Sequence, residues 1–229
     1  MDIKSKKAMN KHYSALYKKY GNDPRTICIR DKVQSDARFK ILSDIMAGDK
    51  TASVLDVGAG LGHLYDYLRA KGWRGQYLGV DINPDLVKAA QKRMKKDNFA
   101  HCVEGNILEG SFVEAIRWDY VICGATLEHR PKFGSYKTHL KYFADMINKM
   151  FLICQKGVAF DIFNSKTVDY KEDYNLYIYP VNLLLMAYDL TPRIVLRADQ
   201  RPFEVVMYLY KQTEKNEFNI FTEWKGDSK

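Results

Sequence analysis

The sequence has few cysteines and no long apolar run. The four cysteines lie far apart and form no Cys-x-x-Cys pair, so neither a disulfide framework nor a zinc site is indicated. The longest apolar runs, at 150–154 and 183–187, are far shorter than the roughly 18 residues that cross a bilayer. Lysines, rather than an apolar segment, follow the charged residues 1–7, so no secretion signal is expected. We therefore expect a cytoplasmic protein without a membrane contact.

Glycine and proline are also scarce, at 14 and 6 of 229 residues. No segment rich in Gly, Ser or Pro divides the chain, and no internal repeat is visible. The sequence predicts a single domain over 1–229. It would consist of a helical N-terminal cap (1–50), an α/β core (51–211) and a tail (212–229).

Basic residues exceed acidic ones, with 36 Lys and Arg against 28 Asp and Glu and a net charge of +8. Residues 1–50 alone hold 12 basic and 6 acidic side chains. Such a surplus can be a solvated face that keeps the protein soluble, or it can steer an anionic partner such as nucleic acid or a phosphorylated metabolite. Composition leaves both interpretations open.

From residue 53, short β-branched runs alternate with segments of helical periodicity. Strands separated by helices of about 10–15 residues indicate βαβ units and a mainly parallel sheet, so the fold class is α/β. The strands at 192–197 and 204–210 are too close for a crossover helix and must pair antiparallel. The other expected strands are 53–57, 76–80, 99–104, 118–123 and 157–163, and the expected helices are 63–71, 84–96, 138–154 and one near 180–190.

Two amphipathic helices are expected before the first core strand. Aromatic and apolar residues from Tyr13 to Tyr20 recur at the spacing of one helical face. A second helix is expected to begin at Ser35, a residue type that caps helix N-termini, and to end at Gly48. Its apolar stripe includes Ala37 and also Arg38, which needs an acceptor because an unpaired buried charge is costly.

A glycine-rich turn follows the first core strand, in the segment Asp56-Val57-Gly58-Ala59-Gly60-Leu61-Gly62. Glycines there allow a tight turn and a close approach of a ligand to the N-terminus of the next helix. A dinucleotide site of the form G-x-G-x-x-G is the rival interpretation, but its third glycine position holds His63. The Asp56 carboxylate would repel a pyrophosphate and attract a sulfonium ligand with an amino group, which favours S-adenosylmethionine.

The second strand ends at Asp81, where an acid at the strand tip can bind both hydroxyls of a ribose. With the turn at 56–62, which matches the motif Asp-x-Gly-x-Gly-x-Gly, this segment resembles the class I S-adenosylmethionine-dependent methyltransferases. The resemblance covers 53–130. It implies a Rossmann-like, doubly wound, mainly parallel seven-stranded sheet with an antiparallel C-terminal strand pair and N-terminal helices. It also implies S-adenosyl-L-methionine as the cofactor and S-adenosyl-L-homocysteine as the product.

The resemblance implies further cofactor contacts at the strand ends. Ile82 would lie against the adenine, and Asn106 with Ile107 would hold the adenine edge, although the family often has Asp at the position of Asn106. Arg38 would pair with the methionine carboxylate or, alternatively, with Asp44 or another structural acid. The remaining expected contacts are the motif residues Gly58, Ala59, Gly60 and Gly62, Cys123 as a small buried residue under the cofactor, and Tyr13, which either caps the cleft or packs in the core.

His129 is the candidate general base, because its ordinary pKa near ~6.5 suits proton transfer at neutral pH. Glu128 or Asp119 would orient its imidazole, whereas the alternative is a loop histidine that only packs near the site. The tyrosine-rich segment 169–179 would form either a lid or acceptor pocket, or a surface of amphipathic rings.

The acceptor is the least determined part of the prediction. The loop after the fourth strand has neither the Asp/Asn-Pro-Pro-aromatic motif of amino-methylating DNA enzymes nor the Pro-Cys nucleophile of cytosine C5 enzymes. Short segments after the fourth and fifth strands leave no room for a target-recognition domain, which favours a small polar acceptor. The positive charge suggests an anionic one, such as a phosphorylated metabolite or a nucleotide-linked sugar. RNA contacted by the basic residues 1–50, or a non-catalytic cofactor-binding partner subunit, are the alternatives.

Overall fold

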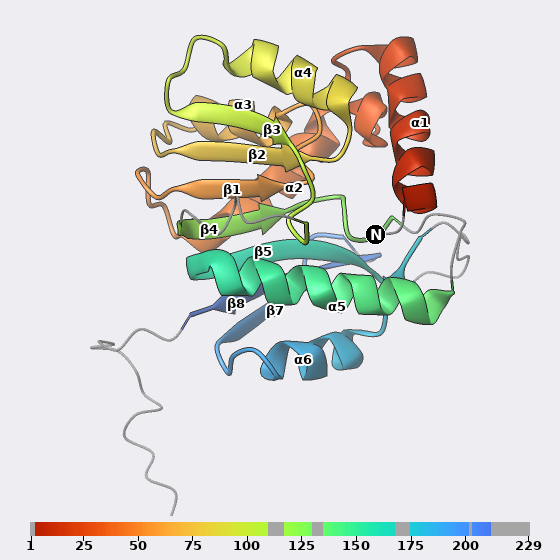
Figure 1. Ribbon diagram of the computed structural model, residues 1–229. Helices are drawn as coiled ribbons and strands as arrows, with labels where there is room; N and C mark the ends of the chain where they lie inside the picture. The colour runs from red at the N-terminus through yellow and green to blue at the C-terminus, as the bar shows by residue number, and fades with distance from the viewer. Residues whose placement is uncertain (1–2, 110–116, 130–134, 168–174, 202, 212–229) are drawn as a thin grey trace, which may run out of the picture.

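β-branched and aromatic runs form one mixed sheet. The computed structural model describes residues 3–109, 117–129, 135–167, 175–201 and 203–211 of the chain. The sheet order is β3-β2-β1-β4-β5-β8-β7, and β6 pairs with β5 (Figure 1). The tail expected at 212–229 lies outside the described residues. The strands are β1 (Val54–Val57), β2 (Tyr77–Asp81), β3 (Ala100–Glu104), β4 (Trp118–Cys123), β5 (Cys154–Asn164), β6 (Tyr177–Ile178), β7 (Ile194–Arg197) and β8 (Glu204–Tyr210).

The pairing of the strands confirms the predicted α/β class. Strands β1 to β5 pair parallel with one another. The last long strand, β8, is antiparallel to β5 and to β7, as the short connection between 197 and 204 requires. The short parallel pair of β5 and β6 was not expected from the sequence.

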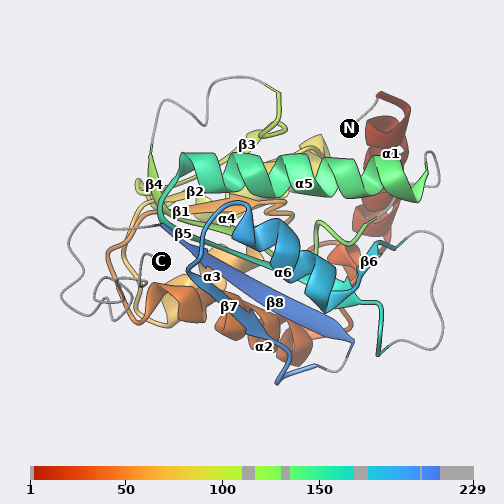
Figure 2. The same ribbon diagram turned by 90° about the horizontal axis from the view of Figure 1, so that it is seen from below.

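Helices cover both faces of the sheet, and two apolar clusters form the core. Figure 2 shows α5 and α2 on opposite faces. One cluster packs α5 and α6 on the sheet, and the other packs α2, α3 and α4 on it. The helices are α1 (Ile3–Tyr20), α2 (Lys32–Ser43), α3 (His63–Ala70), α4 (Pro84–Met94), α5 (Tyr136–Ile153) and α6 (Pro180–Tyr188), with 3-10 turns η1 (Pro24–Ile27) and η2 (Asp44–Met46).

The start of α2 differs from the prediction. Asp31, not Ser35, is the N-cap, and its carboxylate accepts a hydrogen bond of 2.8 Å from the Gln34 N–H. Ser35 is buried one turn inside the helix and shares a face with Arg38. Ala37 is exposed because it lies about 200° around the helix from Ser35, at 100° per residue.

The first helix, α1, stands beside α4 and beyond the carboxyl ends of β1 and β2 (Figure 1). The Asn10 amide donates a 3.0 Å hydrogen bond to the Ile82 carbonyl, and the Ser14 hydroxyl donates a 2.6 Å bond to Asp85. The Asn83 amide donates in turn to the Asn10 carbonyl. These bonds fix α1 on the connection between β2 and α4, so its aromatic face lies over the strand ends. None of the described helices has the length and apolar content to cross a bilayer.

Candidate functional site

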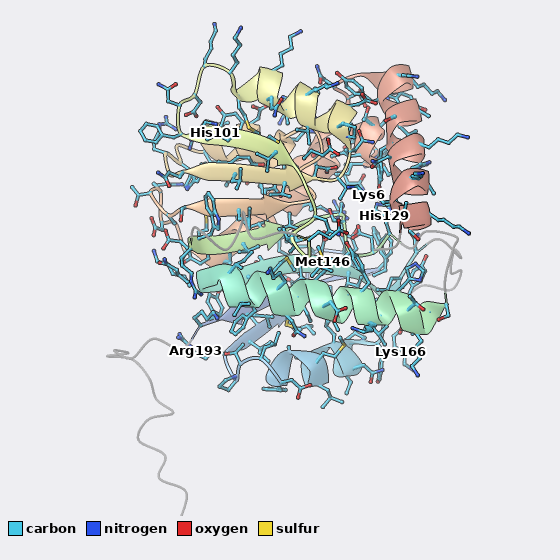
Figure 3. The ribbon with its side chains drawn as sticks, in the orientation of Figure 1. Lys6, His101, His129, Met146, Lys166 and Arg193 are labelled. Atoms are coloured by element: carbon cyan, nitrogen blue, oxygen red, sulfur yellow. The ribbon has the colours of Figure 1, made fainter. Side chains whose placement is uncertain are left out.

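A cleft lies at the carboxyl ends of β1, β2 and β4 and opens to solvent. Ligands of open α/β sheets bind at this edge, where the strands end and the connections diverge. The turns after the strands form its floor, and α1, α2 and α5 contribute walls. Figure 3 shows Met146 on α5 and His129 near the strand ends, on the side that α1 covers.

The turn between β1 and α3 has three glycines in the left-handed region, with φ of +76° at Gly58, +54° at Gly60 and +76° at Gly62. A Cβ at Gly58 would lie 2.1 Å from the Thr126 hydroxyl, so only glycine fits between β1 and the turn after β4. Gly58 and Gly60 line the cleft. Gly62 does not, because it is the N-cap of α3 and packs against Met94. Gly62 therefore has a backbone role in the turn, and its predicted contact with the cofactor stays a prediction.

Asp81 lies at the tip of β2 with its carboxylate held by the backbone. One oxygen accepts a 2.8 Å hydrogen bond from the Gly60 N–H, and the other accepts a 2.8 Å bond from the Asn83 N–H. Burial raises the pKa of Asp81, while these N–H donors lower it. Because a carboxylate oxygen has two lone pairs, each oxygen can accept one more hydrogen bond from a ligand in the cleft.

Asp56 lines the same cleft from the end of β1 and is only 4% exposed. The Tyr77 hydroxyl donates a 2.5 Å hydrogen bond to it. Burial raises the pKa of Asp56 to about 7, Tyr77 opposes this rise, and the charge of Asp81 adds to it. Ionisation of Asp56 therefore becomes favourable when a cationic group lies beside it.

Asn106 and Ile107 line the cleft after β3, as predicted. The Asn106 amide carbonyl accepts a 3.1 Å hydrogen bond from the Leu108 N–H, and its NH₂ group donates to Glu109. The carbonyl therefore retains one lone pair for an outside donor. Ile82 also lines the cleft, next to Asp81.

Cys123 does not reach the cleft. It is fully buried at the end of β4, and burial raises the pKa of its thiol well above the usual range. The cleft is lined instead by the three residues that follow, Gly124, Ala125 and Thr126. Cys123 is thus the small buried residue that was predicted at this strand end, and its position under a cofactor stays a prediction.

Arg38 lines the cleft but is held from behind by three carboxylates. Its Nε lies 2.9 Å from Asp161, its Nη1 lies 3.9 Å from Glu128, and its Nη2 pairs with Glu204. Burial opposes the charge of Arg38, but the acids together raise its pKa. Arg201 adds a second cation 3.0 Å from Glu204. We call these five residues the Arg38 cluster. Arg38 thus pairs with structural acids, which was the alternative to a pairing with the methionine carboxylate, but Asp44 is not one of them.

His129 lines the cleft, and its ring packs edge-to-face on Tyr13, with 5.8 Å between the ring centroids. Burial, followed by the charges of Arg38 and His12, lowers its pKa to about 4. Asp119 does not orient it, because Asp119 lies at the opposite end of β4 and accepts a hydrogen bond from the Ser53 N–H. Glu128 faces Arg38 instead. His129 is thus a neutral imidazole at pH 7.

Several residues that line the cleft could not be predicted from any motif or spacing in the sequence. They are apolar or aromatic side chains that come from segments far apart in the chain, and only the fold brings them together. The tyrosine-rich segment expected as a lid lies largely outside the described residues, although Tyr177 stacks on Phe163 in β5. The unexpected lining residues are Met9, Ile27, Ile29, Phe39, Leu42, Tyr142 and Met146.

Among the described residues, no three His, Cys, Asp or Glu side chains gather closely enough to hold a metal ion. The groups that can bind a ligand are therefore the strand-tip acids, the backbone of the glycine turn and the apolar walls. A carboxylate near a glycine turn suits a cationic ligand better than a pyrophosphate.

Comparison with known proteins agrees with this geometry. Residues 55–147 match a family described as "Methyltransferase domain". A protein of Mycobacterium tuberculosis named as a methyltransferase is 44% identical over 43 residues, which are 19% of this chain and 26% of that protein. The chain thus matches about a quarter of the length of this curated relative.

Solved structures share this fold at low sequence identity. The magnesium protoporphyrin IX methyltransferase of Synechocystis PCC 6803 with bound SAM has a TM-score of 0.64 at 14% identity, over 93% of this chain and 98% of that one. A SAM-dependent methyltransferase from Aquifex aeolicus has a TM-score of 0.57 at 15% identity, over 86% and 97% of the two chains. An O-methyltransferase family protein from Burkholderia thailandensis reaches 0.60 at 12% identity, over 84% and 64%. At these identities, the likeness shows the fold.

Proposed function

We propose that the chain is an S-adenosylmethionine-dependent class I methyltransferase, which the match of residues 55–147 to a methyltransferase domain and the shared fold support. It would transfer a methyl group to an oxygen or nitrogen of a small polar acceptor with an anionic group. A phosphorylated metabolite or a nucleotide-linked sugar has this chemistry. The neighbour from Burkholderia thailandensis is described as an O-methyltransferase, which supports oxygen as the accepting atom. We also propose that 1–50 and 51–211 act as one domain, since α1 supplies Met9 and Tyr13 to the cleft.

The observation that carries the proposal is the pair of strand-tip acids beside the glycine turn. The Asp81 carboxylate has lone pairs left for two ribose hydroxyls. Gly58 and Gly60 line the cleft beside it, where the backbone of the turn can approach a ligand closely. Asp56 would attract the amino group of the cofactor, because a nearby cation stabilises its ionised form. The residues present therefore fit S-adenosylmethionine.

When bound, S-adenosylmethionine supplies an electrophilic methyl group on a sulfonium centre. The chain would hold the acceptor in line with that group and remove one proton from a hydroxyl or ammonium. His129 is neutral near pH 7 and can accept a hydrogen bond from an acceptor hydroxyl. The apolar walls at Ile27 and Ile29 would exclude water from this part of the cleft.

Calorimetric titration tests the cofactor assignment directly. We expect S-adenosylmethionine and S-adenosylhomocysteine to bind, and NAD and NADP not to bind. Asp81→Ala should weaken binding by about 10-fold to 100-fold, because a hydrogen bond to a charged group contributes ~1.5–3 kcal/mol. Glu104→Ala is the matched control, since Glu104 pairs in register with Asp81 at the tip of β3 but is exposed and does not line the cleft. Equal affinity of the two variants would refute the ribose assignment.

RNA methylation is the second candidate function, and one surface feature favours it. Lys4, Lys11 and Lys18 are exposed on α1 at a spacing of seven residues, which places them on one face of the helix. None of them pairs with an acid among the described residues. A lysine stripe of this kind can contact successive phosphates. Binding of a labelled tRNA that weakens steeply with salt would favour this function, and a flat salt dependence would exclude it.

A further inference from the structure

The interior of the cleft offers no free cation to an anionic acceptor among its described residues. Arg38 is the arginine that lines it, and the charge of this guanidinium is offset by Asp161, Glu204 and Glu128. Asp56 and Asp81 add negative charge to the same walls. An anion placed deep in the cleft would therefore be repelled and desolvated without compensation.

The wall around His129 is mostly apolar. Met9 on α1, Ile27 and Ile29 after η1, and Tyr142 on α5 line the cleft together with the His129 ring. Such a wall favours the hydrocarbon or aromatic part of an acceptor, because burial of apolar surface contributes roughly 25 cal/mol per Å². The apolar part and the atom that is methylated would thus lie inside.

Lys6 is a cation on the side of α1 that borders this cleft, although it is not itself a lining residue (Figure 3). Lys6, Met9 and Tyr13 stand at positions i, i+3 and i+7 of α1, so they share one face of the helix. Met9 and Tyr13 both line the cleft. Lys6 is half-buried, and no carboxylate of the described residues pairs with it. Tyr13 contacts the His129 ring, and Figure 3 shows Lys6 and His129 between α1 and the strand ends.

We propose that Lys6 binds an oxyanion of the methyl acceptor, a carboxylate or a phosphate, at the mouth of the cleft while the apolar body of the acceptor lies inside. This inference rests on the proposed methyltransferase function and adds the orientation of the acceptor to it. A lysine suits the position because its aliphatic stem packs along apolar surface while its ammonium stays at the water boundary.

Lys7 provides a matched control for Lys6. It is the next residue on the same helix and carries the same charge, but it is exposed and points about 100° away around the helix axis. Loss of either lysine lowers the net charge equally. A difference between Lys6→Gln and Lys7→Gln therefore measures the local contact rather than the general field of the protein.

The experiment uses three probes with one aromatic body: 3-phenylpropionate, 2-phenylethyl phosphate and the neutral 3-phenylpropionamide. Each is titrated by calorimetry into the full chain saturated with S-adenosylhomocysteine. We expect at least one anionic probe to bind about 3-fold to 10-fold more tightly than the amide, as a partly exposed charge contact contributes ~0.7–1.4 kcal/mol. Lys6→Gln should abolish this preference, Lys6→Arg should retain most of it, and Lys7→Gln should leave it unchanged.

Three results would overturn the proposal. They are equal binding of the amide and both anions, equal loss of the preference in Lys6→Gln and Lys7→Gln, and no binding of any probe to the saturated protein. Failure of S-adenosylhomocysteine itself to bind, measured first, would refute the proposed function instead. The preference of phosphate over carboxylate, or the reverse, identifies which oxyanion the acceptor carries.

Discussion

At the scale of single residues, burial changes what Asp56 can do. Its pKa rises from 3.8 to about 7, mainly because burial disfavours the charge. The folded chain therefore binds this proton more tightly than the unfolded chain does. The resulting contribution to stability is present below about pH 4 and is lost as the pH rises through about 7.

We predict that the free energy of unfolding of the free protein falls less with pH in Asp56→Asn than in the unmodified chain. The difference in slope should reach about 1.4 kcal/mol per pH unit between about pH 4 and pH 7, since the amide cannot ionise. Urea unfolding at several pH values across this window measures it. Parallel pH profiles of the two proteins would show that Asp56 does not titrate there.

Strand-tip residues are the part of the site that the sequence predicts well. Asp56 and Asp81 each follow a β-branched run directly, so the position of the acid at the strand end follows from local pattern. The partners of Arg38 could not be predicted in this way. Asp161 and Glu204 are 123 and 166 residues away in the sequence, and only the order of the strands brings them to Arg38.

At the scale of elements, the turn between β1 and α3 depends on a close approach to the turn after β4. Both Gly58 and Gly72 have positive φ, of +76° and +83°. Only Gly58 is crowded, because a Cβ there meets Thr126, whereas a Cβ at Gly72 meets nothing within 4 Å. A comparison of the same substitution at Gly58 and at Gly72 therefore separates the cost of backbone strain from the cost of steric contact.

Gly72→Ala should lower the free energy of unfolding by about 1–2 kcal/mol, which is the cost of a left-handed residue with a side chain. Gly58→Ala should cost about 1–3 kcal/mol more, because Thr126 must also move. We further expect Gly58→Ala alone to weaken S-adenosylmethionine binding. Thermal unfolding and calorimetry measure both effects, and equal losses in the two variants would rule out the contact with Thr126 as the cause.

Elements with strong periodicity were predicted correctly, and their ends were not. The helical spacing in 32–43 is clear, but Asp31 and Ser35 are both residue types that cap helices. The Asp31 backbone is extended at the cap, and its carboxylate reaches the Gln34 N–H. Which of the two residues caps the helix depends on how the chain enters α2 after η1, and no local sequence pattern predicts that.

At the scale of the whole molecule, the Arg38 cluster joins α2 to β5 and β8. Burial raises the pKa values of Glu128 and Glu204, with Asp161 adding to the rise in both and Arg38 opposing it. The two glutamates therefore hold a proton more tightly than exposed glutamates do, and Arg38 is the charge that limits this rise in both. Removal of Arg38 would leave buried carboxylates without their central cation.

Arg38→Met should lower the free energy of unfolding by about 3–5 kcal/mol. The loss should grow as the pH rises above 4.5, the ordinary glutamate pKa, because Arg38 no longer opposes the raised pKa values of Glu128 and Glu204. The same substitution at Arg197 is the control, because its ion pairs with Asp44 and Asp199 are partly exposed and should contribute at most about 1 kcal/mol. Denaturant unfolding measures both variants. A small loss in Arg38→Met that does not depend on pH would contradict this account.

The position of β8 between β5 and β7 also has a consequence for biosynthesis. A ribosome delivers β7 before β8, yet β7 pairs with β8 and has no other neighbour in the described sheet. The nascent β7 therefore stays unpaired until β8 has been synthesised, and it joins the sheet only through β8. Docking of β8 on β5 also brings Glu204 to Arg38, so the sheet and the Arg38 cluster are completed by the same contact of long sequence separation.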